Sequence, residues 1–174
     1  PDRAAPPFRP CSIFRMMPPG PSPRRLDRMR SSFIAATVFL VLGVGSGMFF
    51  REFTKANHFQ GATQLSLVHA HLLVLGFVVF LLVLILDRLF GLAYGSLFAW
   101  FFWIYNAGLL LTAGAMMAHG VLTVLGEKIS AGVAGIAGIG HILLTVALVL
   151  FLVVLGRGVF AAAAHDRSAP DPQL

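Results

Sequence analysis

Four long apolar segments constrain the fold of this chain more than any other feature of its sequence. A helix needs about 20 apolar residues to cross the hydrocarbon core of a bilayer. No proline interrupts any of the four segments, and charged residues close each of them. Because only helices satisfy their backbone in lipid at this segment length, the sequence predicts an all-α integral membrane protein, a bundle of four transmembrane helices. The predicted helices cover about residues 31–50, 65–86, 96–125 and 131–155.

The composition points the same way. Hydrophobic residues make up 57% of the 174 residues and charged residues only 11%. A water-soluble domain with so few polar side chains could not cover its surface, so the composition excludes one. The one cysteine, Cys11, precedes the first apolar segment, which excludes a disulfide framework and a Cys-x-x-Cys-His haem attachment.

The segments that flank the membrane domain differ in composition from the domain itself. Residues 1–30 hold eight of the ten prolines and seven of the thirteen Lys and Arg residues. Such a stretch cannot bury enough apolar surface to fold, so we expect a disordered basic tail over residues 1–30. We expect the membrane domain over residues 31–157 and a second disordered tail over 158–174. The chain starts with proline, and the candidate initiating methionines are Met16, Met17 and Met29.

The distribution of basic residues predicts the orientation in the membrane. With the N-terminus inside, the seven basic residues of residues 1–30, Arg88, Arg157 and Arg167 lie on the cytoplasmic side, and only Arg51, Lys55 and Lys128 lie outside. Basic residues are enriched in cytoplasmic loops, so we expect both termini in the cytoplasm and the protein in a bacterial inner membrane. At the helix ends, solvated ion pairs are expected for Asp87 with Arg88 and for Glu127 with Lys128.

Small residues indicate where helices approach each other closely. Gly43 and Gly47 form a Gly-x-x-x-Gly pair, and Gly132, Gly135 and Gly138 recur at every third position. Lipid gives no hydrophobic drive for helices to associate, so close packing of backbones supplies it. Ordinary helix packing explains these glycines, and room for a flat, bulky ligand is the alternative.

Four histidines fall inside the predicted helices, where an imidazole without a partner is costly. With a rise of about 1.5 Å per residue, His69 and His71 lie roughly 6–9 Å below the outer surface, and His119 about 9 Å. His141 lies nearer the middle. All four are therefore candidate metal ligands in the outer half of the bilayer. Alternatively, each bonds a group on a neighbouring helix, with Ser46 and Thr145 as partners for His141.

His69 and His71 carry the most specific signal. Residues two apart on an α-helix point about 200° apart, so the two imidazoles cannot bind one metal ion from one helix. They face two partners on opposite sides. Gly76 shares the face of His69 and leaves that face open. The pair suits a helix that stands between two planar cofactors, or between two copies of one cofactor in an oligomer.

Two resemblances follow from these residues. Residues 69–76, His-Ala-His-Leu-Leu-Val-Leu-Gly, resemble the His-x-His helix of the catalytic subunit of haem-copper oxidases, in which the two histidines ligate two haems on opposite faces of one helix. Residues 29–155 also resemble a bacterial family of small four-helix membrane proteins of unknown function, chiefly through residues 51–55, 65–71 and 135–141.

The oxidase resemblance implies an assembly and a cofactor. That subunit consists of three arcs of four helices, so this chain resembles one arc, and the resemblance implies a homo-oligomer of three chains. A non-covalent haem b would then lie at each protomer interface, between His69 of one copy and His71 of the next. Arg51 and Lys55 would neutralise the haem propionates, and His141 is a further candidate cofactor contact.

The resemblance does not extend to oxygen reduction. That reaction requires a copper held by three histidines and a tyrosine one helical turn from one of them. No His-x-x-x-Tyr occurs in any apolar segment, and Tyr94 and Tyr105 lie toward the inner side. The resemblance therefore implies electron transfer or the handling of haem or a gas, and whether the protein is an enzyme stays open.

Two alternatives belong to other functional classes. Met48, Met116 and Met117 lie at the level of His119, and thioether with imidazole ligands suit Cu(I). This pattern favours copper binding or transport. The other alternative is a structural or assembly subunit without a cofactor, in which the histidines only pack.

Overall fold

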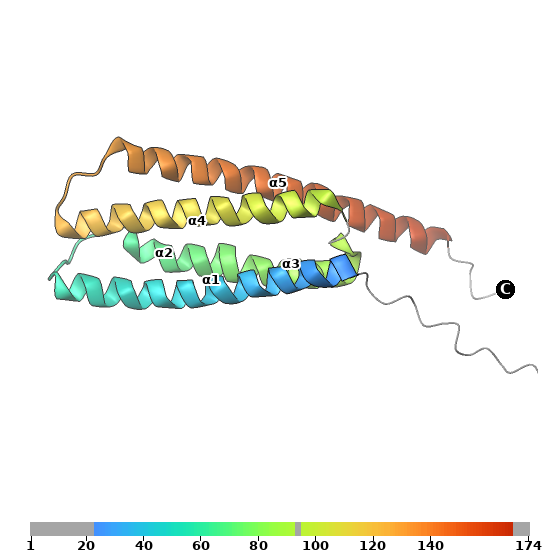
Figure 1. Ribbon diagram of the computed structural model, residues 1–174, viewed down its shortest axis with the longest axis horizontal. Helices are drawn as coiled ribbons and strands as arrows, with labels where there is room; N and C mark the ends of the chain where they lie inside the picture. The colour runs from blue at the N-terminus through green and yellow to red at the C-terminus, as the bar shows by residue number, and fades with distance from the viewer. Residues whose placement is uncertain (1–22, 93–94, 169–174) are drawn as a thin grey trace, which may run out of the picture.

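The computed structural model describes residues 23–92 and 95–168, and every long segment in them is helical. Four helical segments are long and apolar enough to cross a membrane. Figure 1 shows them as α1, then a second span that contains α2 and α3, then α4 and α5. Their bounds are α1 Pro23–Ala56, α2 Leu65–His71, the π-helix η2 Leu72–Val78, α3 Val79–Phe90, α4 Ser96–Leu125 and α5 Ala131–Ser168.

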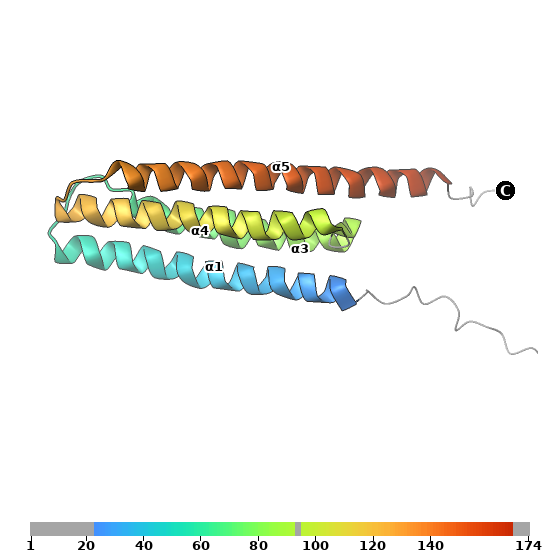
Figure 2. The same ribbon diagram turned by 45° about the horizontal axis from the view of Figure 1, so that its top comes forward.

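The four spans are antiparallel and lie in an open row. The packing contacts join α1 to the second span, the second span to α4, and α4 to α5, while α5 also contacts α3. Figures 1 and 2, which differ by a turn of 45°, both place α1 and α5 on opposite flanks of the row. The beginning of α1 and the end of α5 lie at the same end of the molecule. We call this the terminal end, and the opposite end the histidine end.

Close approach of α1 and the second span depends on glycine, as predicted for the first Gly-x-x-x-Gly pair. A Cβ atom at Gly43 would lie 2.7 Å from the side chain of Leu73, and one at Gly76 would lie 2.5 Å from Phe39. Gly47 faces His69 at a looser distance of 3.5 Å. At this distance the two backbones make dispersion contacts that a larger side chain would prevent.

The glycines of α5 behave differently from the prediction. Gly132, Gly135 and Gly138 are exposed, and a Cβ atom at Gly135 or Gly138 would meet nothing within 4 Å. The expected helix contact through this run is therefore wrong within the described chain. Gly140 instead packs on Thr112 of α4, where a Cβ atom would lie 2.8 Å from the Thr112 amide nitrogen. The spacing of three residues between these glycines pointed to a face of α5 that does not pack on α4.

The first helix begins earlier than predicted. Residues 23–30, expected to be disordered, form the first turns of α1. Proline is tolerated in the first turn of a helix because its missing N–H has no partner there. The arginines that follow are not left to repel each other: Arg25 pairs with Asp87 of α3, and Arg28 donates to the carbonyl oxygen of Gly95 at 2.6 Å.

The partner of Asp87 is also a correction. Its side chain is buried, at 1% exposure, and does not form the expected solvated pair with Arg88. Arg25 Nε lies 3.2 Å from Asp87 Oδ2, and Arg25 Nη2 donates to the Asp87 carbonyl oxygen at 2.6 Å. The pair joins α1 to α3 across 62 residues of sequence.

Other boundaries differ less. α1 continues past Arg51 to Ala56, and α3 ends at Phe90, before Gly91 with a φ of 64°. α5 continues to Ser168, so the disorder expected from residue 158 is wrong as far as that residue. Residues 1–22 and 169–174 of the two predicted tails lie outside the described part of the chain.

Candidate functional site

The four histidines predicted as ligands all lie toward the histidine end. His69 and His71 occupy α2, within two turns of its start at Leu65. His119 precedes the end of α4 by six residues, and His141 lies in the third turn of α5. Arg51 and Lys55 lie on the last turns of α1, at the same end. The antiparallel order of the helices thus gathers these residues toward one end of the bundle.

His71 has one nitrogen committed to its own helix. Its Nδ1 lies 3.0 Å from the carbonyl oxygen of Leu67, and the side chain is half-buried. A carbonyl oxygen can only accept, so Nδ1 must carry the hydrogen of this bond. In the neutral imidazole the lone pair then resides on Nε2. A carbonyl bond of this kind fixes the tautomer and ring orientation in metal-ligating histidines.

His141 repeats this arrangement on α5. Its Nδ1 lies 2.8 Å from the carbonyl oxygen of Ala137, which again leaves the Nε2 lone pair free. The side chain is exposed. Neither predicted partner bonds the ring: Thr145 donates to the His141 backbone carbonyl, and Ser46 donates to the carbonyl of Gly43 within α1. An exposed imidazole on an outer flank is available to a neighbouring molecule or cofactor.

His69 lies against α1 and lacks a partner. Its Cβ atom approaches Gly47, and its Nδ1 is fully buried with no hydrogen bond. Among the described residues, three polar side-chain atoms are fully buried without a hydrogen bond: Ser32 Oγ, His69 Nδ1 and Thr112 Oγ1. His69 Nε2 is not one of them and has no hydrogen bond, so this nitrogen keeps some exposure. Since both residues lie in regular α2, His71 points about 200° away from His69 and therefore away from α1.

A π-helix follows His71 directly, and the sequence reasoning missed it. Residues Leu72–Val78 form wider turns, a feature often found at functional sites. Tyr105 of α4, which is fully buried, donates its hydroxyl to the carbonyl oxygen of Leu75 at 2.8 Å. The sequence predicts Tyr105 toward the inner side, yet its hydroxyl contacts the second span only four residues past His71. No periodicity in the sequence distinguishes a π turn from an α turn.

The two basic residues proposed for propionates follow Gly47 along α1. Arg51 and Lys55 come four and eight residues after Gly47, which places them on successive turns above the same side of the helix. Arg51 is exposed and lies 3.8 Å from Glu52, a loose surface pair. Both cations therefore stay available to an anion above His69.

The remaining candidates do not assemble into a metal site within one chain. His119 contacts Thr123, whose hydroxyl donates to the His119 carbonyl oxygen at 2.8 Å. Met116 is buried in the core, whereas Met48 is 66% exposed on α1. Within residues 23–92 and 95–164, no group of three or more His, Cys, Asp or Glu side chains could hold a metal ion. Copper binding through Met48, Met116 and Met117 stays a prediction.

Comparison with known families assigns the chain. Residues 29–158 match the family described as "Protein of unknown function (DUF2871)". The chain belongs to this family. No curated protein and no solved structure matches it. The predicted resemblance to a family of unknown function is thus confirmed, while the oxidase resemblance stays a prediction.

The DUF2871 match covers all the candidate residues, from Arg51 to His141. Chemically, this DUF2871 protein offers imidazoles on two sides of one helix, at least one with a fixed tautomer, and cations at the membrane boundary above them. A haem iron takes axial ligands such as histidine nitrogen, and the ring and its two carboxylates need an apolar surround and cationic partners. The residues present fit such a group.

Proposed function

We propose that this DUF2871 protein is a membrane b-type haem protein that transfers electrons or handles haem or a gas bound to it. The observation that carries the proposal is the hydrogen bond from His71 Nδ1 to the Leu67 carbonyl, which leaves Nε2 as a free ligand on a half-buried imidazole. A histidine that only packed in a membrane helix would be expected to use both ring nitrogens.

His69 supports the same proposal from the other side of α2. An imidazole with a buried, unpaired Nδ1 is costly in an apolar environment unless another interaction compensates for it. A bond from Nε2 to iron would offset that cost for the ring as a whole, with Nδ1 carrying the ring hydrogen. Because His69 and His71 diverge by about 200°, they would serve two different haems or two copies of one interfacial haem.

The open row of helices supports an assembly of several copies. A single row leaves both flanks exposed, and α5 carries Gly135 and Gly138 with open space around them. We propose a homotrimer in which each chain corresponds to one four-helix arc of the haem-copper oxidase subunit. His69 of one copy and His71 of the next would then hold one haem at each interface, with His141 as a further contact.

The cations of α1 fit the anionic edge of that cofactor. Arg51 and Lys55 lie beyond Gly47, which faces His69, and both are exposed. They would pair with the propionates at the membrane surface, where such pairs add affinity and fix which edge of the haem points outward. The haem supplies one-electron chemistry when bound, and the chain supplies axial nitrogens and an apolar enclosure.

The decisive test is the visible spectrum of the full-length protein, purified in detergent from cells that produce haem. We expect a b-type band in the reduced-minus-oxidised difference spectrum and iron in matching amount by metal analysis. His69→Ala and His71→Ala should each lose most of the haem. His58→Ala is the matched control, because His58 lies in the exposed turn after α1 and should leave the spectrum unchanged.

Other outcomes separate the alternatives. Wild-type protein that folds but binds no haem in the presence of haem would refute the proposal and leave a structural or assembly subunit. Copper in place of iron, lost when Met48, Met116 and Met117 are all replaced by leucine, would favour copper binding. Copper measured in the same samples therefore decides between the two cofactors.

A further inference from the structure

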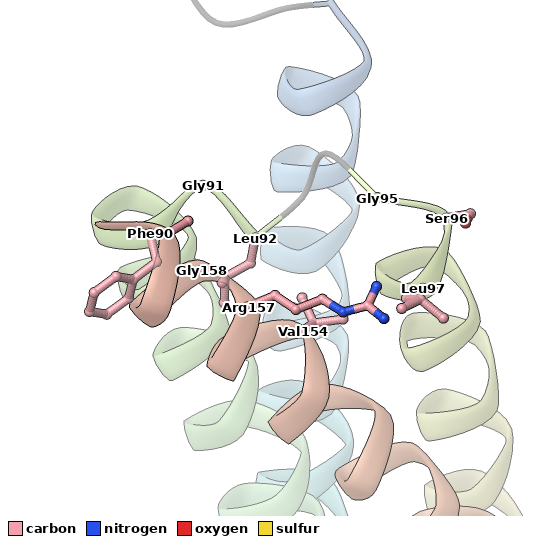
Figure 3. A pocket seen from close by; sticks show the side chains of 10 residues that line it. Phe90, Gly91, Leu92, Gly95, Ser96, Leu97, Val154, Arg157 and Gly158 are labelled. Carbon is pink, nitrogen blue, oxygen red and sulfur yellow. The ribbon is translucent and has the colours of Figure 1, made fainter. Parts of the chain in front are cut away.

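A cavity lies at the terminal end, far from the histidines. It has a volume of about 330 Å³ and lies between α5, the segment of residues 90–92 and the start of α4. Figure 3 shows its walls: Phe90 and Leu92 on one side, Leu97 on the other, and Val154 of α5 below. Gly158 allows α5 to approach this segment, since a Cβ atom there would lie 3.1 Å from Phe90. The lining is mostly apolar.

One cation extends across this cavity. Figure 3 shows the guanidinium of Arg157 reaching from α5 toward Leu97 at the start of α4. In the described part of the chain Arg157 has no hydrogen bond or ion pair. The buried carboxylate of Asp87 on α3 is engaged by Arg25. Arg157 is exposed, so an anion from outside the chain can approach its guanidinium.

The chemistry of the cavity fits a phosphate with an apolar attachment. A guanidinium presents paired N–H donors that match two oxygens of a phosphate group. Ser96 and Leu97 line the same cavity, and Gly95, which precedes α4, provides no side-chain cap for the free amides of its first turn. The apolar walls suit an acyl chain. Arg88 and Arg157 close their spans, so the cavity opens at the boundary of the membrane.

We propose that this cavity binds the phosphate of an anionic phospholipid, with Arg157 as its main charged contact. Basic pockets between transmembrane helices recognise such headgroups in this way. The site requires only that the four helices span a membrane, so it is independent of any haem. It would fix the second span, α4 and α5 to one another through a lipid at the terminal end.

Lipid binding by the full-length protein tests the site directly. We would titrate phosphatidylglycerol into detergent-solubilised protein and count bound lipids by native mass spectrometry, with phosphatidylcholine and inorganic phosphate as parallel probes. Wild-type protein should retain phosphatidylglycerol in preference to phosphatidylcholine. Arg157→Gln should weaken phosphatidylglycerol binding about fivefold, and Arg157→Lys by less, because lysine keeps the charge and loses the paired donors.

Two further variants control the experiment. Arg30→Gln removes one exposed charge from α1 at the terminal end without touching the cavity, and should bind like the wild type. Ala161→Trp keeps Arg157 but fills the cavity, and should lose the lipid. The proposal is overturned if Arg157→Gln and Arg30→Gln bind equally well. It is also overturned if inorganic phosphate competes as strongly as the lipid, which would indicate a site for free phosphate.

Discussion

Two helix carbonyls, those of Leu67 and Ala137, accept hydrogen bonds from imidazoles one turn further along the chain. These bonds determine which nitrogen of His71 and His141 is free. The sequence predicts that histidines gather at one end of the bundle, because helix order and depth follow from apolar segments. It could not predict the tautomers, since these depend on side-chain rotamers within each helix. Asp87 was misassigned for a related reason: its partner is 62 residues away.

The Arg25–Asp87 pair gives a prediction at this scale. Asp87→Ala removes the carboxylate from a buried pair and leaves Arg25 without it, which should lower the free energy of unfolding by about 3–5 kcal/mol. Thermal unfolding of the purified protein in detergent, followed by circular dichroism, measures the change. The control is Glu52→Ala, because its pair with Arg51 is exposed and should contribute about 0–1 kcal/mol. Equal losses for the two variants would contradict this account of the buried pair.

At the scale of helices, the predicted spans are confirmed, and their ends are the part that sequence could not define. Apolar length identifies a membrane span, but it does not report where the helix stops in water. Residues 23–30 became helical because Arg25 and Arg28 find partners on α3 and beside α4. The π-helix could not be predicted from the sequence either, because η2 is as apolar as its α-helical neighbours.

The π-helix leads to a prediction about the histidines. A π turn contains one residue more than an α turn, so deletion of the lipid-facing Val74 should convert η2 to an α-helix. Because the π turns hold the extra residue, its removal leaves α2 and α3 on nearly the same faces, and His69 and His71 keep their positions. We expect helix content and haem both to persist, as measured by circular dichroism and the visible spectrum. Deletion of the exposed Leu82 from the regular helix α3 should instead turn α2 by about 100° relative to the end of α3 and lose the haem.

Glycine at the α4–α5 interface provides a second prediction for the helices. A Cβ atom at Gly108 would lie 2.9 Å from the backbone nitrogen of Leu144, so Gly108→Ala must push the helices apart. Overpacking of this kind costs about 1–3 kcal/mol, measurable as a lower unfolding temperature. Gly138→Ala on the open face of α5 should leave that temperature unchanged or raise it slightly. A destabilised Gly138→Ala monomer would show that this face packs within the chain after all.

For the whole molecule, the basic residues predict which end faces the cytoplasm. The terminal end carries Arg24, Arg25, Arg28, Arg30, Arg88 and Arg157, so it should lie inside. Single cysteines introduced at Gln60 and at Ser130, in a chain with Cys11 replaced by serine, should react with a membrane-impermeant maleimide in intact cells. A cysteine at Arg30 should react only after the membrane is broken. The reverse pattern would invert the proposed topology.

The length of α5 has a consequence of its own. With 38 residues it measures about 57 Å, nearly twice the roughly 30 Å of a hydrocarbon core. Past Gly158, where the DUF2871 match ends, Phe160 is 77% exposed and Ala161–Ala164 are exposed as well. The final turns of α5 therefore extend past the family match with most of their side chains exposed. A chain cut after Ala164 should insert and fold as the intact one does.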